Sequence, residues 1–141
     1  MIDIDCTGGP STLSIEIRFP AGLPGFPHAH DFQLAPIGDA DTPFLLLTAV
    51  DDPSARFIVV TPRTFYPEYE FRLDDVEAER LGLREARDAL VFCMVTLRDK
   101  PHHATVNMLG PIVVNRRTLE AAQVVVPAIG YGTRAPLAVA S

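Results

Sequence analysis

Two histidine clusters are the residues whose spacing could hold a metal ion. His28 and His30 stand two positions apart, and His102-His103 could add a third ligand. Residues two apart on a strand point to the same face, so the first pair could share a metal, as in many β-barrel metal sites. A cupin-like site would also need a carboxylate soon after the pair, but positions 33 and 34 hold Gln and Leu. Both clusters adjoin prolines, which is typical of polar turns, so we expect no metal. A metal-dependent cupin-like β-barrel enzyme using His28 and His30 is the alternative.

Other catalytic chemistry lacks its usual sequence context. The chain has no Gly-x-Ser-x-Gly turn, and Gly8-Gly9-Pro10 lacks the Lys-Ser/Thr of a phosphate-binding loop. Cys93 lies in an apolar run, which predicts an inert core thiol rather than an activated thiolate. We therefore expect a protein that is not an enzyme, with no catalytic residue, no cofactor and no small-molecule substrate.

Size and charge favour one domain that binds another protein. A chain of 141 residues buries roughly two thirds of its surface on folding, so we expect a single domain over residues 1–141. The net charge of -6 would repel a phosphate backbone, and the densest basic stretch is the pair Arg116-Arg117. We expect no direct nucleic-acid binding. An acidic surface instead suits a basic protein partner.

The N-terminus and the cysteines predict a cytoplasmic location. Residues 1–5 are acidic where a secretory signal would begin with basic residues. The longest apolar runs, 44–47 and 90–95, are far too short to span a bilayer, so we expect no membrane association. Without an export signal, Cys6 and Cys93 should be reduced thiols rather than a disulfide.

Short apolar runs, separated by 13 prolines and 9 glycines, predict a mainly β domain of the sandwich or barrel type. The clearest strand is 13–19, where apolar and polar residues alternate. Residues 44–50 should form a buried strand and pair with 56–61 as a hairpin, and 90–97 should form a central strand. The connections are too short for helical crossovers, so the sheet should be antiparallel. Further strands are expected at 32–34, 104–108, 112–114 and 123–126.

Helix should be a minority element at one end of the sheets. Asp74 with Glu77 three residues later predicts a capped helix start, and Leu81-Gly82 predicts its end. A second short helical piece is expected over 84–89, where helix formers dominate.

Several motifs stand out as an ordered series along the chain. They are Ile17-Arg18-Phe19, Gly22-Leu23-Pro24-Gly25-Phe26, Pro43-Phe44, Phe57 to Pro62, Tyr66-Pro67-Glu68-Tyr69, Thr105 to Asn115, Gln123-Val124-Val125, Tyr131 and Arg134. In order and spacing this series resembles the FliW family of flagellar assembly factors. The resemblance implies a single-domain antiparallel β-barrel-like fold, with one or two short helices and neither a cofactor nor catalytic activity.

The resemblance also implies a partner-switching role. Such a protein would bind newly made flagellin in the cytoplasm and, once flagellin is exported, would bind the translational repressor CsrA. This binding would act allosterically, away from the RNA-binding surface of CsrA, and would match flagellin synthesis to export. A FliW-like chaperone for another secreted partner is a further alternative.

The best candidates for partner contact are Tyr66, Glu68 and Tyr69. A proline keeps this segment irregular, and two tyrosines with an acid resemble an interface anchor. Asn107 and Asn115 flank a proline, where their amides could contact a partner or bind the turn backbone.

The chain departs from the family's pattern at a few positions. Pro27 stands where a Glu is usual, Thr48-Ala49 replaces a Gln-Ser pair, and Gly110 replaces an Ala. The first two changes remove polar groups that could contact a partner, so they bear on the partner surface rather than on the fold.

Overall fold

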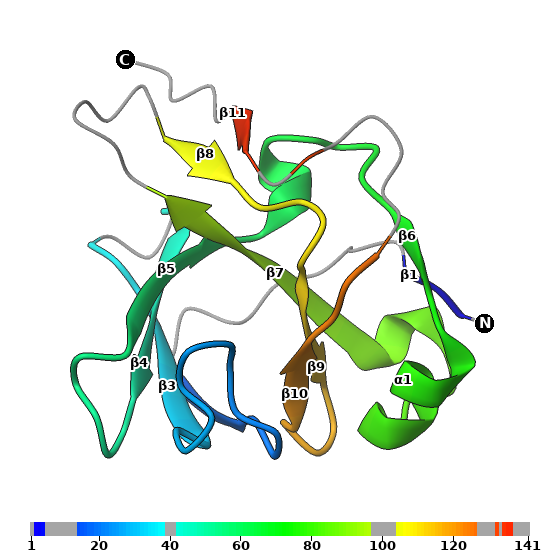
Figure 1. Cartoon of the computed structure of the whole chain (residues 1–141). Coiled ribbons are helices and arrows are strands. Elements are labelled where there is room, and N and C mark those ends of the chain that lie inside the picture. The colour runs from blue at the N-terminus through cyan, green and yellow to red at the C-terminus, as the bar shows by residue number, and fades with distance from the viewer. Residues whose placement is uncertain are drawn as a thin grey trace.

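The computed structural model shows a mainly β protein with one short α-helix (Figure 1). It describes residues 2–4, 14–38, 42–96, 104–126, 132 and 134–136. The helical elements are α1 (Asp75–Leu81) and two 3-10 turns, η1 (Pro62–Thr64) and η2 (Ala86–Asp88). The strands are β1 (Ile2–Ile4), β2 (Ile15–Arg18), β3 (Asp31–Pro36), β4 (Phe44–Ala49), β5 (Arg56–Val60), β6 (Phe71–Leu73), β7 (Ala89–Thr96), β8 (Thr105–Val106), β9 (Ile112–Asn115), β10 (Ala121–Gln123) and β11 (Ala135–Pro136).

The main sheet is antiparallel and curled, but it does not close. Its strands follow the order β10-β9-β7-β5-β4-β3-β2, with β8 added to β7 and β11 to β8, while β1 and β6 form a separate pair. Within the described part of the chain, the two edge strands meet in a single parallel bridge between Arg18 and Glu120. There the Arg18 N–H donates to the carbonyl of Leu119 at 2.9 Å. The predicted antiparallel β fold is confirmed, although "barrel-like" describes the open sheet only loosely.

Strand β7 lies at the centre of the sheet, as predicted. It pairs with β5, β8 and β9, and it is buried without interruption from Ala89 to Cys93. Val91 and Cys93 belong to one hydrophobic cluster, whereas Leu90 and Phe92 belong to another on the opposite face. A strand that is covered on both faces needs a continuous apolar run, which explains why its sequence does not alternate.

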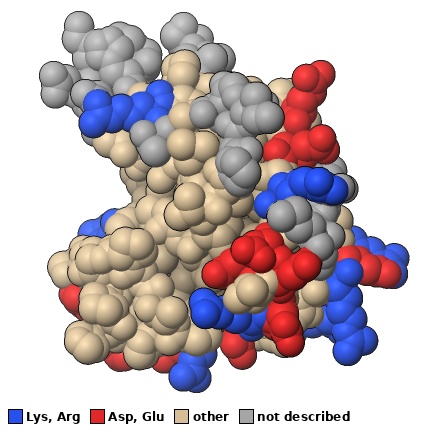
Figure 2. All heavy atoms as spheres, turned by 45° about the vertical axis from the view of Figure 1, so that its right-hand side comes forward, with Lys and Arg blue, Asp and Glu red and all other residues tan. Residues whose placement is uncertain are grey.

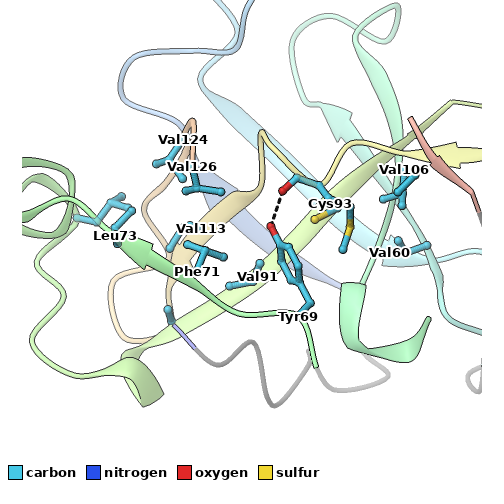
Figure 3. Packing of buried hydrophobic residues seen from close by; sticks show 14 of the residues in the cluster. Val60, Tyr69, Phe71, Leu73, Val91, Cys93, Val106, Val113, Val124 and Val126 are labelled. Atoms are coloured by element: carbon cyan, nitrogen blue, oxygen red, sulfur yellow. Dashed lines mark hydrogen bonds between the residues drawn. The ribbon is translucent and has the colours of Figure 1, made fainter. Parts of the chain in front are cut away.

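The first cluster fills the space between β7, β9, β6 and α1 (Figure 3). Tyr69 lies at its centre, with its ring 5.7 Å from that of Phe71. Its members larger than alanine are Val60, Tyr69, Phe71, Leu73, Leu81, Leu83, Val91, Cys93, Val106, Met108, Val113, Val124 and Val126.

The second cluster lies inside the curl of the sheet. Phe19 and Phe32 form its aromatic centre, with ring centroids 5.1 Å apart in an edge-to-face arrangement. Strand β3 alternates between exposed and buried residues, and β4 likewise buries every second side chain. The prediction of a buried strand at 44–50 is therefore right for one face only, because the other face of β4 remains partly exposed.

Helix α1 begins and ends at the predicted residues. The Asp74 carboxylate accepts a hydrogen bond from the Val76 N–H at 3.1 Å, and Gly82 ends the helix with φ of 69°. This left-handed conformation favours glycine, since a side chain there would be strained. The second predicted helical piece is the 3-10 turn η2, which Glu85 and Asp88 cap reciprocally.

Some strands escape prediction from the pattern. β6 and β11 are only three and two residues long, and β1 is equally short, too short for any periodicity to show. The strand expected at 104–108 shrinks to Thr105–Val106, because a turn begins at Asn107. Among the described residues, no helix is long and apolar enough to cross a membrane.

A pair of valine truncations tests the role of the two-sided core. Val113 is fully buried in the first cluster, whereas the side chain of Val125 is 92% exposed. Val113→Ala should lower the free energy of unfolding by about 2 kcal/mol, because two methyl groups are lost and a cavity remains. Val125→Ala deletes the same atoms at the surface and should change it by less than about 0.5 kcal/mol. Urea denaturation of both variants measures the difference, and equal effects would contradict the assigned core.

Candidate protein-binding surface

The described histidines, His28 and His30, belong to no group of side chains that could hold a metal. His28 is exposed and His30 half-buried, and both lie in the turn before β3 rather than on a strand. His28 borders a shallow groove with Asp51 and Asp52, yet no group of three or more His, Cys, Asp or Glu side chains in the described part of the chain could hold a metal. His102-His103 lie outside the described residues. The geometry that the cupin-like alternative requires, two histidines on one strand face, is absent from the described turn.

Residues 61–70 form an irregular loop, here called the Tyr66 loop, between β5 and β6. Pro62 begins the 3-10 turn η1, and its carbonyl accepts hydrogen bonds from the N–H groups of Phe65 and Tyr66 at 3.1 and 2.9 Å. A second turn follows, in which the Tyr69 N–H donates to the carbonyl of Tyr66 at 2.9 Å. The backbone of the loop is thus held by its own short-range hydrogen bonds, and its tip projects Pro67 and Glu68.

Tyr69 anchors this loop in the first cluster. Its side chain is fully buried, and its hydroxyl donates to the carbonyl of Met108 at 2.7 Å (Figure 3). The guanidinium of Arg63 donates to the carbonyl of Tyr69 at 3.0 Å. Tyr69 therefore offers no surface to a partner in this structure, contrary to the expectation from the sequence, and its role is to hold the loop against the 107–110 turn.

Tyr66 and Glu68 remain accessible. Tyr66 is half-buried, and its hydroxyl donates to the carbonyl of Pro136. Pro67 and Glu68 are exposed, and the four residues 65–68 line a shallow hollow. The structure thus presents an aromatic ring, a proline and a carboxylate together, which is the composition expected of an interface anchor. Contact with a partner by Tyr66 and Glu68 stays a prediction.

The two asparagines are used inside the chain. The Asn107 carbonyl oxygen accepts from the N–H groups of Leu109 and Gly110, each at 3.0 Å. Asn115 is fully buried; its carbonyl oxygen accepts from Arg117 and Thr118 at 2.8 and 3.2 Å. Both amides therefore bind turn backbone, which was one of the two possibilities for these residues. Asn115 has no accessible surface for a partner, whereas Asn107 is half-buried and its contact stays a prediction.

Asn115 also joins two elements that are distant in sequence. Its amide nitrogen donates to the carbonyl of Leu81, at the end of α1, at 2.6 Å. The carbonyl oxygen holds the β9–β10 turn, where Leu119 adopts a φ of 62°. A positive φ is uncommon for a residue other than glycine, and the amide of Asn115 helps to hold this conformation.

Gly110 fits the crowded turn that Asn107 builds. The Gln123 side chain donates to the Gly110 carbonyl at 2.9 Å. A Cβ atom at position 110 would lie 3.0 Å from the Asn107 amide nitrogen and 3.1 Å from that of Gln123. Neither Gln123 nor Arg63 was expected to have a structural role, since single polar residues at strand ends and in loops carry no pattern in the sequence.

Charges near the helix differ from those of the Tyr66 loop. Acidic and basic side chains alternate over one part of the surface (Figure 2), and pairs such as Arg80–Glu77 and Arg117–Asp88 lie 3.6 and 3.9 Å apart around α1 and η2. Backbone N–H groups of Arg84 and Glu85 lower the pKa of Asp88. By contrast, Glu68 has no ion pair within the described part of the chain.

Cys93 is an inert core residue, as predicted from its apolar run. It is fully buried in the first cluster. This burial raises the pKa of the thiol from 9.0 to about 12, although a hydrogen bond with Tyr69 acts in the opposite direction. The reactive thiolate is therefore disfavoured at neutral pH.

Paired tyrosine variants test the anchoring of the loop. Tyr69→Phe should destabilise the protein by about 1–2 kcal/mol, because the buried Met108 carbonyl loses its donor. Tyr66→Phe removes the same atom, but water can replace it, so the loss should stay below about 0.5 kcal/mol. Thermal unfolding of both variants gives the comparison; a larger loss for Tyr66→Phe would contradict the anchoring role.

The raised pKa of Cys93 predicts slow labelling of its thiol. The same shift makes stability depend on pH: because the pKa of the folded thiol lies above that of the unfolded thiol, its contribution to the free energy of unfolding is complete below pH 9 and is lost as the pH rises towards 12.

In a Cys6→Ser variant at pH 8, iodoacetamide should label Cys93 at least about a hundredfold more slowly in the native protein than in guanidinium. Rapid native labelling, followed by mass spectrometry, would show that the cluster opens.

Comparisons with known proteins agree with the fold and its motifs. The family model described as FliW protein matches residues 10–137. The flagellar assembly factor FliW of Heliobacterium modesticaldum is 38% identical over 84% of this chain and 76% of its own length, and that of Bacillus subtilis is 37% identical over 86% and 84%. The crystal structure of a flagellar assembly factor FliW superimposes with a TM-score of 0.80 at 30% identity, over 89% of this chain and 86% of that one. The chain belongs to the FliW family of flagellar assembly factors.

Proposed function

We propose that this protein is a non-enzymatic, cytoplasmic regulator that binds flagellin and the repressor CsrA in a mutually exclusive manner. The observation that carries the proposal is the match to the FliW family over nearly the whole chain. By relieving repression when flagellin has been exported, the protein would couple flagellin synthesis to assembly. It would act without a cofactor or small-molecule substrate and as one domain.

The Tyr66 loop is the surface that we propose for partner contact. Its backbone is fixed by internal hydrogen bonds and by the buried Tyr69, so little conformational freedom would be lost on binding. Its tip combines the half-buried ring of Tyr66 with the exposed carboxylate of Glu68, next to the Asn107 turn. A partner with a basic side chain beside an apolar one would match this pair, and the net charge of -6 would speed its approach.

Competition between purified partners tests the proposed function. Immobilised protein should retain flagellin and CsrA separately at micromolar concentration, and an excess of flagellin should displace CsrA, as measured by interferometry. Failure to bind either protein would overturn the proposal. Simultaneous binding of both would overturn the mutually exclusive mechanism.

Charge reversal tests the proposed surface. Glu68→Lys should weaken binding of at least one partner by about tenfold or more, because a like charge would face the partner's basic side chain. Glu79→Lys makes the same charge change at an exposed position of α1 and should alter affinity by less than about threefold. Equal affinities for the two variants would remove the Tyr66 loop from the interface.

A further inference from the structure

The outer edge of β10 carries backbone groups that face away from the sheet. The N–H groups of Val124 and Val126 donate inward, to the carbonyls of Pro111 and Leu109, at 2.9 and 3.0 Å. Ala122 pairs with Val113 in the same register. Because consecutive residues of a strand turn their backbone groups to opposite sides, those of the intervening positions 121, 123 and 125 face outward.

This edge is not protected in the usual way. Natural edge strands carry charges, prolines or bulges that prevent further pairing. Residues 121–126 read Ala-Ala-Gln-Val-Val-Val and contain no charge and no proline. Val125 is 92% exposed between two buried valines. Beyond the bridge from Arg18 to Glu120, no described strand pairs with this side of β10.

Partly buried apolar side chains lie beside the edge. The amide nitrogen of Gln123 is 4.0 Å from the sulfur of Met94, so this edge residue adjoins the rim of the second cluster. Met94 is partly buried there, as are Phe57 and Phe26, whose rings lie 5.6 Å apart edge to face. In Figure 2 the front of Figure 1 has turned to the left, and on that side most of the visible surface is uncharged, with Lys or Arg side chains above and below it.

We propose that this open edge binds an extended, uncharged segment of a partner protein, which adds a strand next to β10. Its backbone would pair with Gln123 and Val125, and an apolar side chain would pack against the partly buried Met94. Main-chain hydrogen bonds provide affinity in this mode of recognition, while side-chain contacts such as the one with Met94 provide specificity. The proposal rests on the proposed function, since it assigns a second contact to a protein that acts by binding other proteins.

A flexible partner segment fits this edge better than a second copy of the chain. The part of the edge beyond the bridge from Arg18 to Glu120 and beyond Ala121, residues 122–126, spans five residues, or about 17 Å. Pairing two such edges would bury an area on the order of a few hundred Å², well below the roughly 1,000 Å² of a specific interface. An extended segment can pair along the edge and also pack against Met94, which a second β10 in register with the first would leave uncovered.

Substitutions at Val125 test the proposal with the full-length protein. Val125→Pro removes one outward N–H, whereas the inward hydrogen bonds of Val124 and Val126 stay in place. Val125→Lys keeps the backbone and adds an edge charge. Both variants should melt within a few degrees of the wild type, yet bind flagellin or CsrA at least about tenfold more weakly. Val125→Thr keeps the backbone and the branched shape and should stay within about threefold of the wild type.

Amide exchange shows whether a strand is added. On saturation with whichever of the two proteins binds, the amides of Gln123 and Val125 should exchange at least about tenfold more slowly, while those of Val124 and Val126 change much less. Unchanged affinity for the proline and lysine variants, or no new protection at Gln123 and Val125, would overturn this inference alone. Wild-type protein that binds neither flagellin nor CsrA would overturn the proposed function with it. A dimer in sedimentation that Val125→Pro dissolves would replace the partner segment with a second copy.

Discussion

The rest of the structure depends on the burial of β7 on both of its faces. Its alternate side chains enter two separate clusters, one beneath the Tyr66 loop and α1 and one inside the curl of the sheet. The two clusters are coupled, because each covers one apolar face of the same strand. The sheet therefore curls around one face of β7, while the helix and loops cover the other face.

Two of the polar residues that the sequence marks as candidates for partner contact instead stabilise the packing of loops and helix against the sheet. Tyr69 and Asn115 are fully buried, and each ties a loop or helix end to a carbonyl far away in the sequence. Such buried polar contacts are costly unless every group is satisfied, and no described buried side-chain polar atom lacks a partner. The accessible chemistry is accordingly left to the few side chains at loop tips and at the open sheet edge.

The sequence predicts this fold well wherever one physical rule dominates locally. The sequence predicts the caps of α1, the alternation in β2 and β3 and the apolar run of β7. Helix caps, half-buried strands and strands buried on both faces each have a distinct residue pattern. The burial of a single polar residue in a loop depends on tertiary packing and cannot be predicted from its sequence neighbours. Tyr69 and Glu68 are adjacent in an irregular loop, yet Tyr69 lies in the core and Glu68 in solvent. The open edge at Val125 was also beyond prediction, since it depends on where two ends of a curled sheet fail to meet.

The amide of Asn115 has a consequence for the order in which the chain folds. It serves the last turn of α1 on one side and the β9–β10 turn on the other, and a half-formed set of these hydrogen bonds would leave a buried polar group without partners. Docking of the helix and closure of the hairpin should accordingly form a single cooperative unit. Intermediates with the hairpin formed but the helix detached would therefore be sparsely populated, and few partly folded chains with exposed apolar surface would accumulate during synthesis.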